Sequence, residues 1–354
     1  MSEAFGWILG IESSCDETAA AVLNNGATVA ANLVASQTGL HEAYGGVVPE
    51  LASRQHMETI NMLIDHALAQ ASLTLADLHG IAVSKGPGLA GALLVGVSTA
   101  KALAYSLGIP LVGINHMEGH IYANWLADSQ GQSDSQALNH DTRDIPFPLL
   151  GLVVSGGHTA LAILMDHGKY RLLGQTRDDA AGEVFDKVAR AMGLGYPGGP
   201  VLDRLAREGD PFAYDLPWTR LKNDPWGFSF SGLKTAVLNR INQEAMRGAE
   251  LRKADLAASF QETVTAQLAE KALAAANAHG IGRILLAGGV AANSALRQKM
   301  AVSCENNGLV LYLPSLAYCT DNAAMIACAG YHRLQAGFRD DLTLNAEPSL
   351  GFNW

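Results

Sequence analysis

Residues 7–26 read WILGIESSCDETAAAVLNNG, and their pattern decides the fold. An apolar run at 8–11 leads into a small polar turn, and a second apolar run at 19–23 leads into the turn Asn24-Asn25-Gly26. An Asn-Gly turn between two apolar runs is a strong signal for a β-hairpin. We therefore expect three consecutive strands between residues 7 and 36.

The same order recurs at residues 149–168, which read LLGLVVSGGHTALAILMDHG. Each three-strand unit is followed by a helical pattern, a strand, a glycine-rich loop, a second helix and a last strand. The leading helix and the two strands fall at 60–71, 81–84 and 111–114 in the first half, and at 257–276, 284–286 and 309–313 in the second. This recurrence indicates an α/β fold built from duplicated βββαβαβα halves.

A polar segment rich in Gln, Ser, Asn and Asp separates the two halves. We expect an N-terminal half over residues 1–128, a linker over 129–145 and a C-terminal half over 146–354. The second half contains an extra block at about 176–251, which we expect to be mostly helical. The arrangement resembles the actin, Hsp70 and sugar kinase (ASKHA) superfamily, and this resemblance implies a ligand site in an inter-lobe cleft.

The composition limits the class of protein. The 354 residues include 24 Lys and Arg against 34 Asp and Glu, which gives a net charge of −10 without any basic run. A stand-alone nucleic-acid binder is therefore disfavoured. The four cysteines form no C-x-x-C pair, the N-terminal residues lack the basic segment of a signal peptide, and the apolar run 89–97 is too short for a membrane span. We expect a soluble cytoplasmic protein with no membrane role.

Two histidines and one aspartate form a candidate metal site. His116 and His120 are four residues apart after a predicted strand, so a helix would place both imidazoles on one face. Two exposed or capping histidines are the alternative. Asp321 follows the corresponding strand of the second half, so we expect it to face the histidines across the cleft. Glu118 is in the wrong position for the H-E-x-x-H motif of a zinc protease.

The glycine-rich loops are candidate phosphate sites. Ser155-Gly156-Gly157 follows the strand that ends with Val153 and Val154, and its backbone N–H groups could form a phosphate nest or an ordinary β-turn. The loop 85–91 gives a weaker signal of the same kind. Asn293 follows a third glycine loop, where it could bond a base or ribose or act only as a helix N-cap.

The extra block adds carboxylates beside glycines. Asp186 lies on a predicted helix, the turn Tyr196-Pro197-Gly198-Gly199-Pro200 follows, and Asp203 is expected to start another helix. A carboxylate near a Gly-Gly turn can bind ribose hydroxyls, although a surface pair of Asp186 with Lys187 is equally simple. For Phe228–Thr235 the pattern predicts no clear role. Packing explains the phenylalanines, and Lys234 is a candidate phosphate ligand.

Three carboxylates, those of Glu12, Asp16 and Glu17, lie within six residues of the first turn. They are either a solvated hairpin face or a site that accepts protons or cations. The expected position in the cleft favours the second interpretation.

Nine motifs in a fixed order resemble the universal tRNA threonylcarbamoyladenosine transferase family, which is called TsaD in bacteria. The resemblance covers residues 8–330 and rests on E-S-S-C-D-E-T, K-G-P-G-L-A-G, N-H-M-E-G-H, V-S-G-G-H-T, F-D-K, Y-P-G-G-P, F-S-F-S-G-L-K-T, A-G-G-V-A-A-N and C-T-D-N-A-A-M. It implies transfer of the threonylcarbamoyl group from threonylcarbamoyl-AMP to the exocyclic amine of the adenosine 3′ of the anticodon, in tRNAs that read codons beginning with A.

The resemblance also implies a site, a cofactor and partners. It implies one divalent transition metal, Fe²⁺ or Zn²⁺, held by His116, His120 and Asp321, and adenylate contacts from Val153, Val154, Ser155, Gly156, Gly157, Asp186, Gly199, Asp203 and Asn293. Asp16 and Glu17 are our candidates for accepting the proton of the amine. The expected partners are tRNA, an inactive paralogue (TsaB-like), an ATPase (TsaE-like) and an upstream threonylcarbamoyl-AMP synthase. The alternatives are a metal-dependent O-sialoglycoprotein endopeptidase and a non-catalytic nucleotide-binding regulator.

Overall fold

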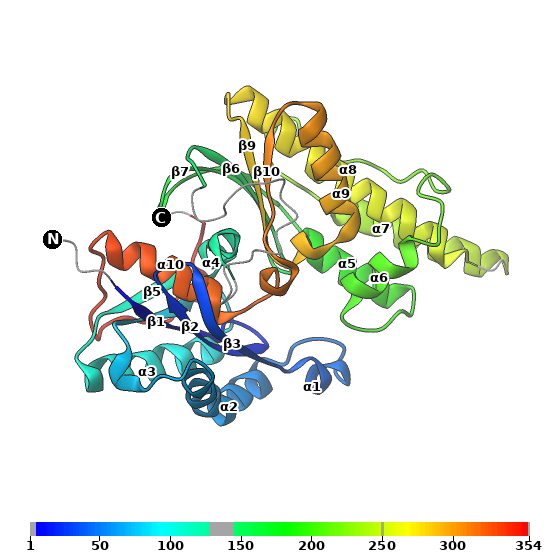
Figure 1. The fold of residues 1–354 in the computed structure, drawn as a ribbon. Coiled ribbons are helices and arrows are strands. Elements are labelled where there is room, and N and C mark those ends of the chain that lie inside the picture. The colour runs from blue at the N-terminus through cyan, green and yellow to red at the C-terminus, as the bar shows by residue number, and fades with distance from the viewer. Residues whose placement is uncertain (1–4, 128–144, 249–250, 353–354) are drawn as a thin grey trace. The chain divides into compact units, whose positions relative to one another are not determined.

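The computed structural model describes residues 5–127, 145–248 and 251–352 (Figure 1). The chain divides into two compact units. The first consists of residues 1–146, 166–169 and 314–354, and the second of residues 147–165 and 170–313. The expected linker at 129–145 lies outside the described residues except for Ile145.

The first unit is built on a five-stranded mixed sheet with the order β3-β2-β1-β4-β5. Its strands are β1 (Trp7–Glu12), β2 (Glu17–Asn24), β3 (Thr28–Ser36), β4 (Gly80–Gly86) and β5 (Leu111–Asn115). Its helices are α1 (Thr38–Glu42), α2 (Pro49–Gln70), α3 (Ala90–Leu107), α4 (His116–Tyr122) and α10 (Ala323–Gln335), with short 3₁₀ turns at η1 (Leu75–Asp77), η2 (Ala123–Trp125) and η4 (Leu316–Tyr318). The strands β1, β2 and β3 are antiparallel neighbours, whereas β4 and β5 run parallel to β1.

Helices cover both faces of the first sheet (Figure 1). Because side chains alternate along β1, Leu9 and Ile11 point to one face, where they join the core formed with α2 and α3. α10 packs on the other face against β1, β2 and β4. The helix α3 is long and apolar enough to cross a membrane by length and composition alone, but Val97 and Ala100 of this helix lie in the core of the sheet.

The second unit repeats this plan with the order β10-β9-β6-β7-β8. Its strands are β6 (Leu149–Val154), β7 (Thr159–Asp166), β8 (Lys169–Gln175), β9 (Arg283–Ala287) and β10 (Val310–Tyr312). Its helices are α5 (Ala181–Ala191), α6 (Gly198–Ala206), α7 (Ser231–Arg247), α8 (Lys253–Ala278) and α9 (Ser294–Asn306), with the 3₁₀ turn η3 (Gly289–Ala292). Counted outward from β1 and from β6, the strand orders are the same, which confirms the predicted duplication.

The extra block at 176–251 contains α5, α6 and α7, and an irregular stretch over residues 207–230 separates the last two. Residues 314–354 follow the second sheet in sequence but belong to the first unit. Two glycines allow α10, which belongs to this last segment, to pack closely on the first sheet. A Cβ at Gly10 of β1 would collide with the carbonyl oxygen of Ala323 and lie 2.9 Å from the Cβ of Ala327, and a Cβ at Gly330 would collide with Ala82.

We expect Gly10→Ala to lower the free energy of unfolding by about 1–3 kcal/mol, because the added methyl group overpacks the contact with α10. The matched control is Gly39→Ala, where no atom lies within 4 Å of the added methyl group. Its effect should stay within about 0.5 kcal/mol. Urea unfolding monitored by circular dichroism measures the free energy of unfolding of both variants. Equal stability of the two variants would show that the packing of α10 on the first sheet does not require a glycine at position 10.

Candidate functional site

The helix α4 holds two histidines on one face. Asn115 caps this helix, because its side-chain oxygen accepts the backbone N–H of Met117 at 2.9 Å. His116 and His120 follow one turn apart, with ring centroids separated by 4.7 Å. His116 is 7% exposed and His120 is fully buried. The helix predicted from the spacing is confirmed, and the alternative of two exposed histidines is wrong.

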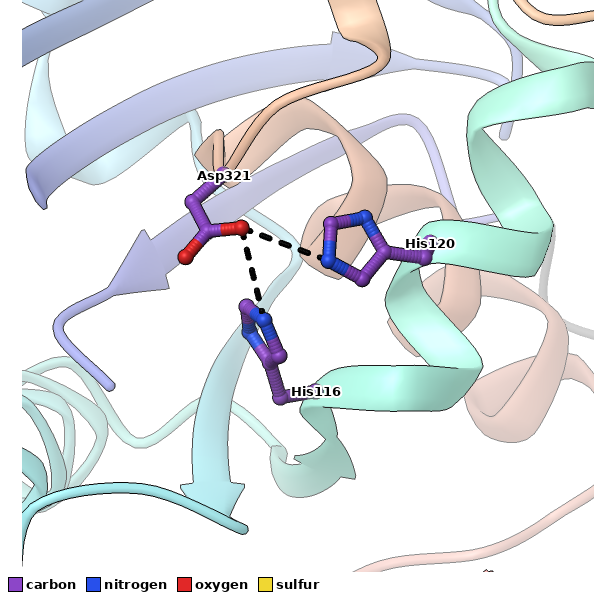
Figure 2. Close-up of side chains that lie close together, drawn as sticks. All are labelled: His116, His120 and Asp321. Carbon is purple, nitrogen blue, oxygen red and sulfur yellow. Dashed lines mark ion pairs between the residues drawn. The ribbon is translucent and has the colours of Figure 1, made fainter. Parts of the chain in front are cut away.

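Asp321, which directly precedes the N-cap of α10, lies beside the two histidines. Asn322 caps α10 by accepting the N–H of Met325 at 3.0 Å, and its amide donates to the carbonyl of Thr320 at 2.8 Å. The Oδ1 atom of Asp321 lies 3.5 Å from Nε2 of His116 and 3.3 Å from Nε2 of His120 (Figure 2). The three candidate ligand atoms all lie within 4.8 Å of one another.

The position of Asp321 corrects one expectation. The duplication argument places this residue opposite the histidines across a cleft between the halves. In the structure, His116, His120 and Asp321 all belong to the first compact unit. The physical reason is the packing of α10 on the first sheet, which brings the start of this helix beside α4.

The chemistry of these side chains fits a divalent transition metal. Neither ring nitrogen of His120 has a hydrogen bond of acceptable geometry within the described part of the chain, although both are buried. Leaving such a group unsatisfied costs about 1–3 kcal/mol, so a ligand on this ring would relieve a real penalty. Two imidazoles and one carboxylate are donors that zinc and non-haem iron use in open, catalytic sites.

The electrostatic environment also favours a cation. Burial alone would lower the pKa of His116, but the carboxylates of Asp321 and Glu12 raise this pKa well above its usual range. Burial alone would raise the pKa of Asp321, but His116 and His120 hold it well below its usual range. The negative surroundings that favour a proton on His116 would equally favour a metal ion in its place.

The turn between β1 and β2 brings further carboxylates to the first unit. Burial, followed by the nearby charges of Asp321 and Asp16, raises the pKa of Glu17 to about 9. Glu17 therefore holds its proton at neutral pH in the absence of a nearby cation. Its Oε1 accepts a hydrogen bond from Ser36 at 3.3 Å. Burial and the same carboxylates raise the pKa of the Cys15 thiol, so this cysteine is not a thiolate at neutral pH.

A buried histidine that the sequence did not indicate supports this turn. The Nδ1 atom of His56 lies 2.7 Å from the hydroxyl of Thr18, and its Nε2 lies 3.0 Å from the carbonyl of Cys15. Burial lowers the pKa of His56, so the ring is neutral and can donate to the carbonyl while it accepts from the hydroxyl. The helical periodicity of α2 marks His56 only as a residue of the buried face.

In the second unit, the expected phosphate loop is a tight turn after β6. The N–H of Ser155 donates to the carbonyl of His158 at 2.8 Å, and the Ser155 hydroxyl accepts the N–H of His158 at 3.1 Å. Gly156 and Gly157 have open space where side chains would project. The β-turn is therefore confirmed, and its outer side is accessible to a ligand.

Asp186 and Gly199 meet at the start of α6. The Oδ1 atom of Asp186 accepts the backbone N–H groups of Gly198 at 2.8 Å and Gly199 at 3.2 Å. The rigid turn expected at 196–200 is therefore partly helical, because α6 begins at Gly198. Asp203 does not start a helix but lies inside α6, which corrects the sequence prediction. Lys187 pairs with Asp179 and Glu183 at 2.7 Å each.

Asp203 and Asn293 connect α6 to α9. Asp203 accepts a hydrogen bond from the Ser294 hydroxyl at 2.8 Å and is 3.1 Å from the guanidinium of Arg207. Asn293 caps α9 through the N–H of Leu296 at 2.9 Å, and its amide donates to Gln261 at 2.8 Å. The N-cap role considered for Asn293 is confirmed. Its possible role toward a ligand stays a prediction.

Backbone contacts bring the glycine loops together in the second unit. A Cβ at Gly288, whose φ is +92°, would collide with the carbonyl oxygen of Val154, and one at Gly182 would lie 2.6 Å from the carbonyl oxygen of Ser155. The parallel strands β6 and β9 both end at this edge of the sheet. The carboxyl edge of a parallel pair is where ligands of open α/β sheets bind.

The segment Phe228–Thr235 anchors the start of α7. Asp178 accepts hydrogen bonds from the hydroxyl of Ser229 at 2.5 Å, from the N–H of Phe230 at 2.8 Å and from the hydroxyl of Ser231 at 2.8 Å. Lys234 forms an ion pair with Asp179. The ion pair with Asp179 gives Lys234 a structural role that needs no phosphate. No pattern within residues 228–235 could have revealed this pair, because Asp179 lies far earlier in the sequence.

Comparison with known proteins identifies the family. Residues 28–328 match the family model described as TsaD, tRNA N6-adenosine threonylcarbamoyltransferase. The chain belongs to this family. A relative with this description from Symbiobacterium thermophilum is 54% identical over 346 residues, covering 98% of this chain and 97% of the relative. One from Clostridioides difficile is 50% identical over 345 residues, covering 98% of each chain.

Membership of the TsaD family establishes the reaction. The chain is an enzyme of tRNA modification that forms N6-threonylcarbamoyladenosine, the t6A nucleoside. The match describes a transferase rather than the endopeptidase or the non-catalytic regulator that the sequence left open. The chain spans nearly the full length of these relatives.

Solved structures agree with the fold. Full-length HypF in its phosphate- and nucleotide-bound form has a TM-score of 0.56 at 13% identity, covering 94% of this chain and 46% of that chain. Component A of the (R)-2-hydroxyglutaryl-CoA dehydratase of Acidaminococcus fermentans has a TM-score of 0.50 at 14% identity, covering 94% and 99%. At these identities the likeness concerns the fold alone.

Proposed function

We propose that this transferase uses one divalent transition metal, Fe²⁺ or Zn²⁺, bound by His116, His120 and Asp321. The observation that carries the proposal is the position of Oδ1 of Asp321, within 3.5 Å of Nε2 of both histidines. The buried imidazole of His120 has no hydrogen bond of acceptable geometry within the described residues, which leaves its Nε2 open to a metal beside Asp321. When bound, such a metal supplies Lewis-acid polarisation of a carbonyl oxygen, here that of the carbamoyl group.

The substrate we propose for the second unit is threonylcarbamoyl-AMP. Val153 and Val154 end β6. The hydroxyl of Ser155 and the backbone N–H groups of Gly156 and Gly157 suit the phosphate, and Asp186, Gly199, Asp203 and Asn293 suit the ribose and base. The open space at Gly156, Gly157 and Gly199 supports close approach of a ligand to the backbone. Backbone N–H groups in such a turn attract anions without needing a cationic side chain.

The residues of the chain then have mainly an orienting task. The mixed anhydride of a carbamate and a phosphate is already activated, so positioning supplies much of the rate. The attacking amine of adenosine must lose a proton, and we assign Asp16 as its first acceptor. Burial and the charges of Asp321 and Asp16 raise the pKa of Glu17 in the metal-free chain, and a cation bound to Asp321 would lower it again, so Glu17 is the second candidate acceptor beside Asp16.

The partners we propose follow from charge. The chain carries 24 cationic against 34 acidic side chains, so it has few groups to offer a polyphosphate. Affinity for nucleic acid comes largely from cations that neutralise phosphates. We propose that an inactive paralogue and an ATPase supply part of the protein surface that binds tRNA. We also propose that a synthase supplies threonylcarbamoyl-AMP and that all of these proteins act in the cytoplasm.

We expect His120→Ala and Asp321→Ala to abolish stoichiometric metal binding while a cooperative thermal transition persists. The transition of His120→Ala should move to lower temperature, because this side chain is fully buried. Affinity should fall as the pH is lowered, since protons compete for His116, whose pKa the neighbouring carboxylates raise. Metal analysis after dialysis and chelator competition at several pH values measure both effects. The control is His66→Ala, an exposed position on α2. Unchanged metal content in both site variants would refute the assignment.

We expect Asp186→Ala to weaken the binding of a stable adenylate analogue by about 1.5–3 kcal/mol, the range for loss of a charged acceptor. Asp186→Asn separates two roles, because its oxygen can still accept the N–H groups that cap α6 while the charge is lost. Titration calorimetry measures all three proteins. If Asp186→Ala binds within twofold of the parent, Asp186 serves only to cap α6.

We expect the isolated chain to bind tRNA weakly at physiological salt and the partner proteins to tighten this binding and switch on transfer. Filter binding over a salt titration, with and without partners, measures the affinity, and nucleoside mass analysis measures the product. Submicromolar binding by the chain alone with a steep salt dependence would show that it builds a complete tRNA site by itself.

A further inference from the structure

A second carboxylate, that of Glu12, contacts the candidate metal site through the far side of the His116 ring. Glu12 is the last residue of β1 and is 0% exposed. Its Oε2 atom lies 3.0 Å from Nδ1 of His116, on the side of the ring opposite the Nε2 that faces Asp321. Its Oε1 atom accepts the backbone N–H of Ser14 at 2.6 Å. Both carboxylate oxygens are therefore engaged as acceptors.

The charge of Glu12 needs a counterpart. Within the described ranges, neither Lys nor Arg forms an ion pair with Glu12, and its partner of that kind is His116. Burying an uncompensated carboxylate is costly, so its charge must be balanced through the imidazole that it touches. The two negative charges of Glu12 and Asp321 together would balance one divalent cation.

The hydrogen bond decides which nitrogen of His116 can bind a metal. A carboxylate accepts only, so Nδ1 must hold a hydrogen, which leaves the lone pair of a neutral ring on Nε2. Nε2 is the atom that faces Oδ1 of Asp321 at 3.5 Å. The hydroxyl of Ser14, 3.2 Å from Nδ1, can share the same hydrogen and so does not change this assignment.

We propose that Glu12 is a positioning residue that fixes the tautomer and orientation of His116 for metal binding. This inference rests on the metal site proposed above. A carboxylate behind a metal-binding imidazole makes the ring a better ligand, and loss of such a partner typically lowers metal affinity 10–100-fold. Through Ser14, the same carboxylate also connects His116 to the turn that contains Asp16.

The substitution Glu12→Gln is a sharp test because Glu12 accepts on both sides. A glutamine has one oxygen and one NH₂ group in the same space. If its NH₂ faces Ser14, two donors meet at a position where the present separation is 2.6 Å. If its NH₂ faces His116, it favours the tautomer with hydrogen on Nε2, which cannot bind the metal there. Either orientation weakens the site.

The experiment measures zinc affinity of the full chain by competition with a chromophoric chelator. We expect Glu12→Gln to bind zinc 10–100-fold more weakly than the parent. The matched control is Glu118→Gln, which changes another fully buried carboxylate, one paired with Arg333 at 2.8 Å. Its zinc affinity should stay within about twofold of the parent, since the pairing of Glu118 with Arg333 does not set the tautomer of a histidine.

A second measurement needs no variant. In the zinc-loaded parent, nitrogen-15 NMR should show a hydrogen retained on Nδ1 of His116 and a metal-shifted Nε2. Zinc on Nδ1, or zinc affinity of Glu12→Gln within twofold of the parent, would overturn the role of Glu12 while leaving the metal site intact. A parent chain that binds no zinc and no iron would overturn both, and so the two failures are distinguishable.

Discussion

The close seating of α10 on the first sheet is the constraint on which the candidate metal site depends. The strand β1 accepts the helix only because Gly10 has no side chain, and α10 in turn presents Gly330 to Ala82. This packing fixes the first residues of the helix, and Asp321 comes directly before its N-cap. A slip of one helical residue, about 1.5 Å along the axis, would move the carboxylate away from both imidazoles.

In the sites that we propose, the two halves use one backbone plan for ligands of opposite charge. The turn between β1 and β2 spans residues 13–16, and the equivalent turn between β6 and β7 spans residues 155–158. The first turn has acidic side chains beside it, an environment suited to a cation. The second presents glycines and backbone N–H groups, an environment suited to a phosphate. Duplication therefore supplied the frame, and side chains of a few turn residues supplied the different chemistry.

Local patterns predicted the strands, the duplication and the helix with His116 and His120, because periodicity and turn residues act over a few positions. They could not place Asp321 in the first unit. Its position there is set by the packing of α10 on strands that lie more than two hundred residues earlier in the sequence. Asp203 was misplaced because the Pro-Gly-Gly-Pro run suggested a turn, whereas Asp186 caps a helix that begins within that run. The anchoring of Phe228–Thr235 by Asp178 is likewise a contact over about fifty residues.

The discontinuity of the first unit has a consequence for biosynthesis. The strands β1 to β5 leave the ribosome long before residues 314–354, which complete their unit. Until then, the face of the sheet around Gly10 and Ala82 has no helix to cover it, a state that invites association with chaperones. Binding at the proposed metal site would then be a late step of maturation. A prematurely terminated chain that lacks Asp321 would keep both histidines and still have no complete set of ligands.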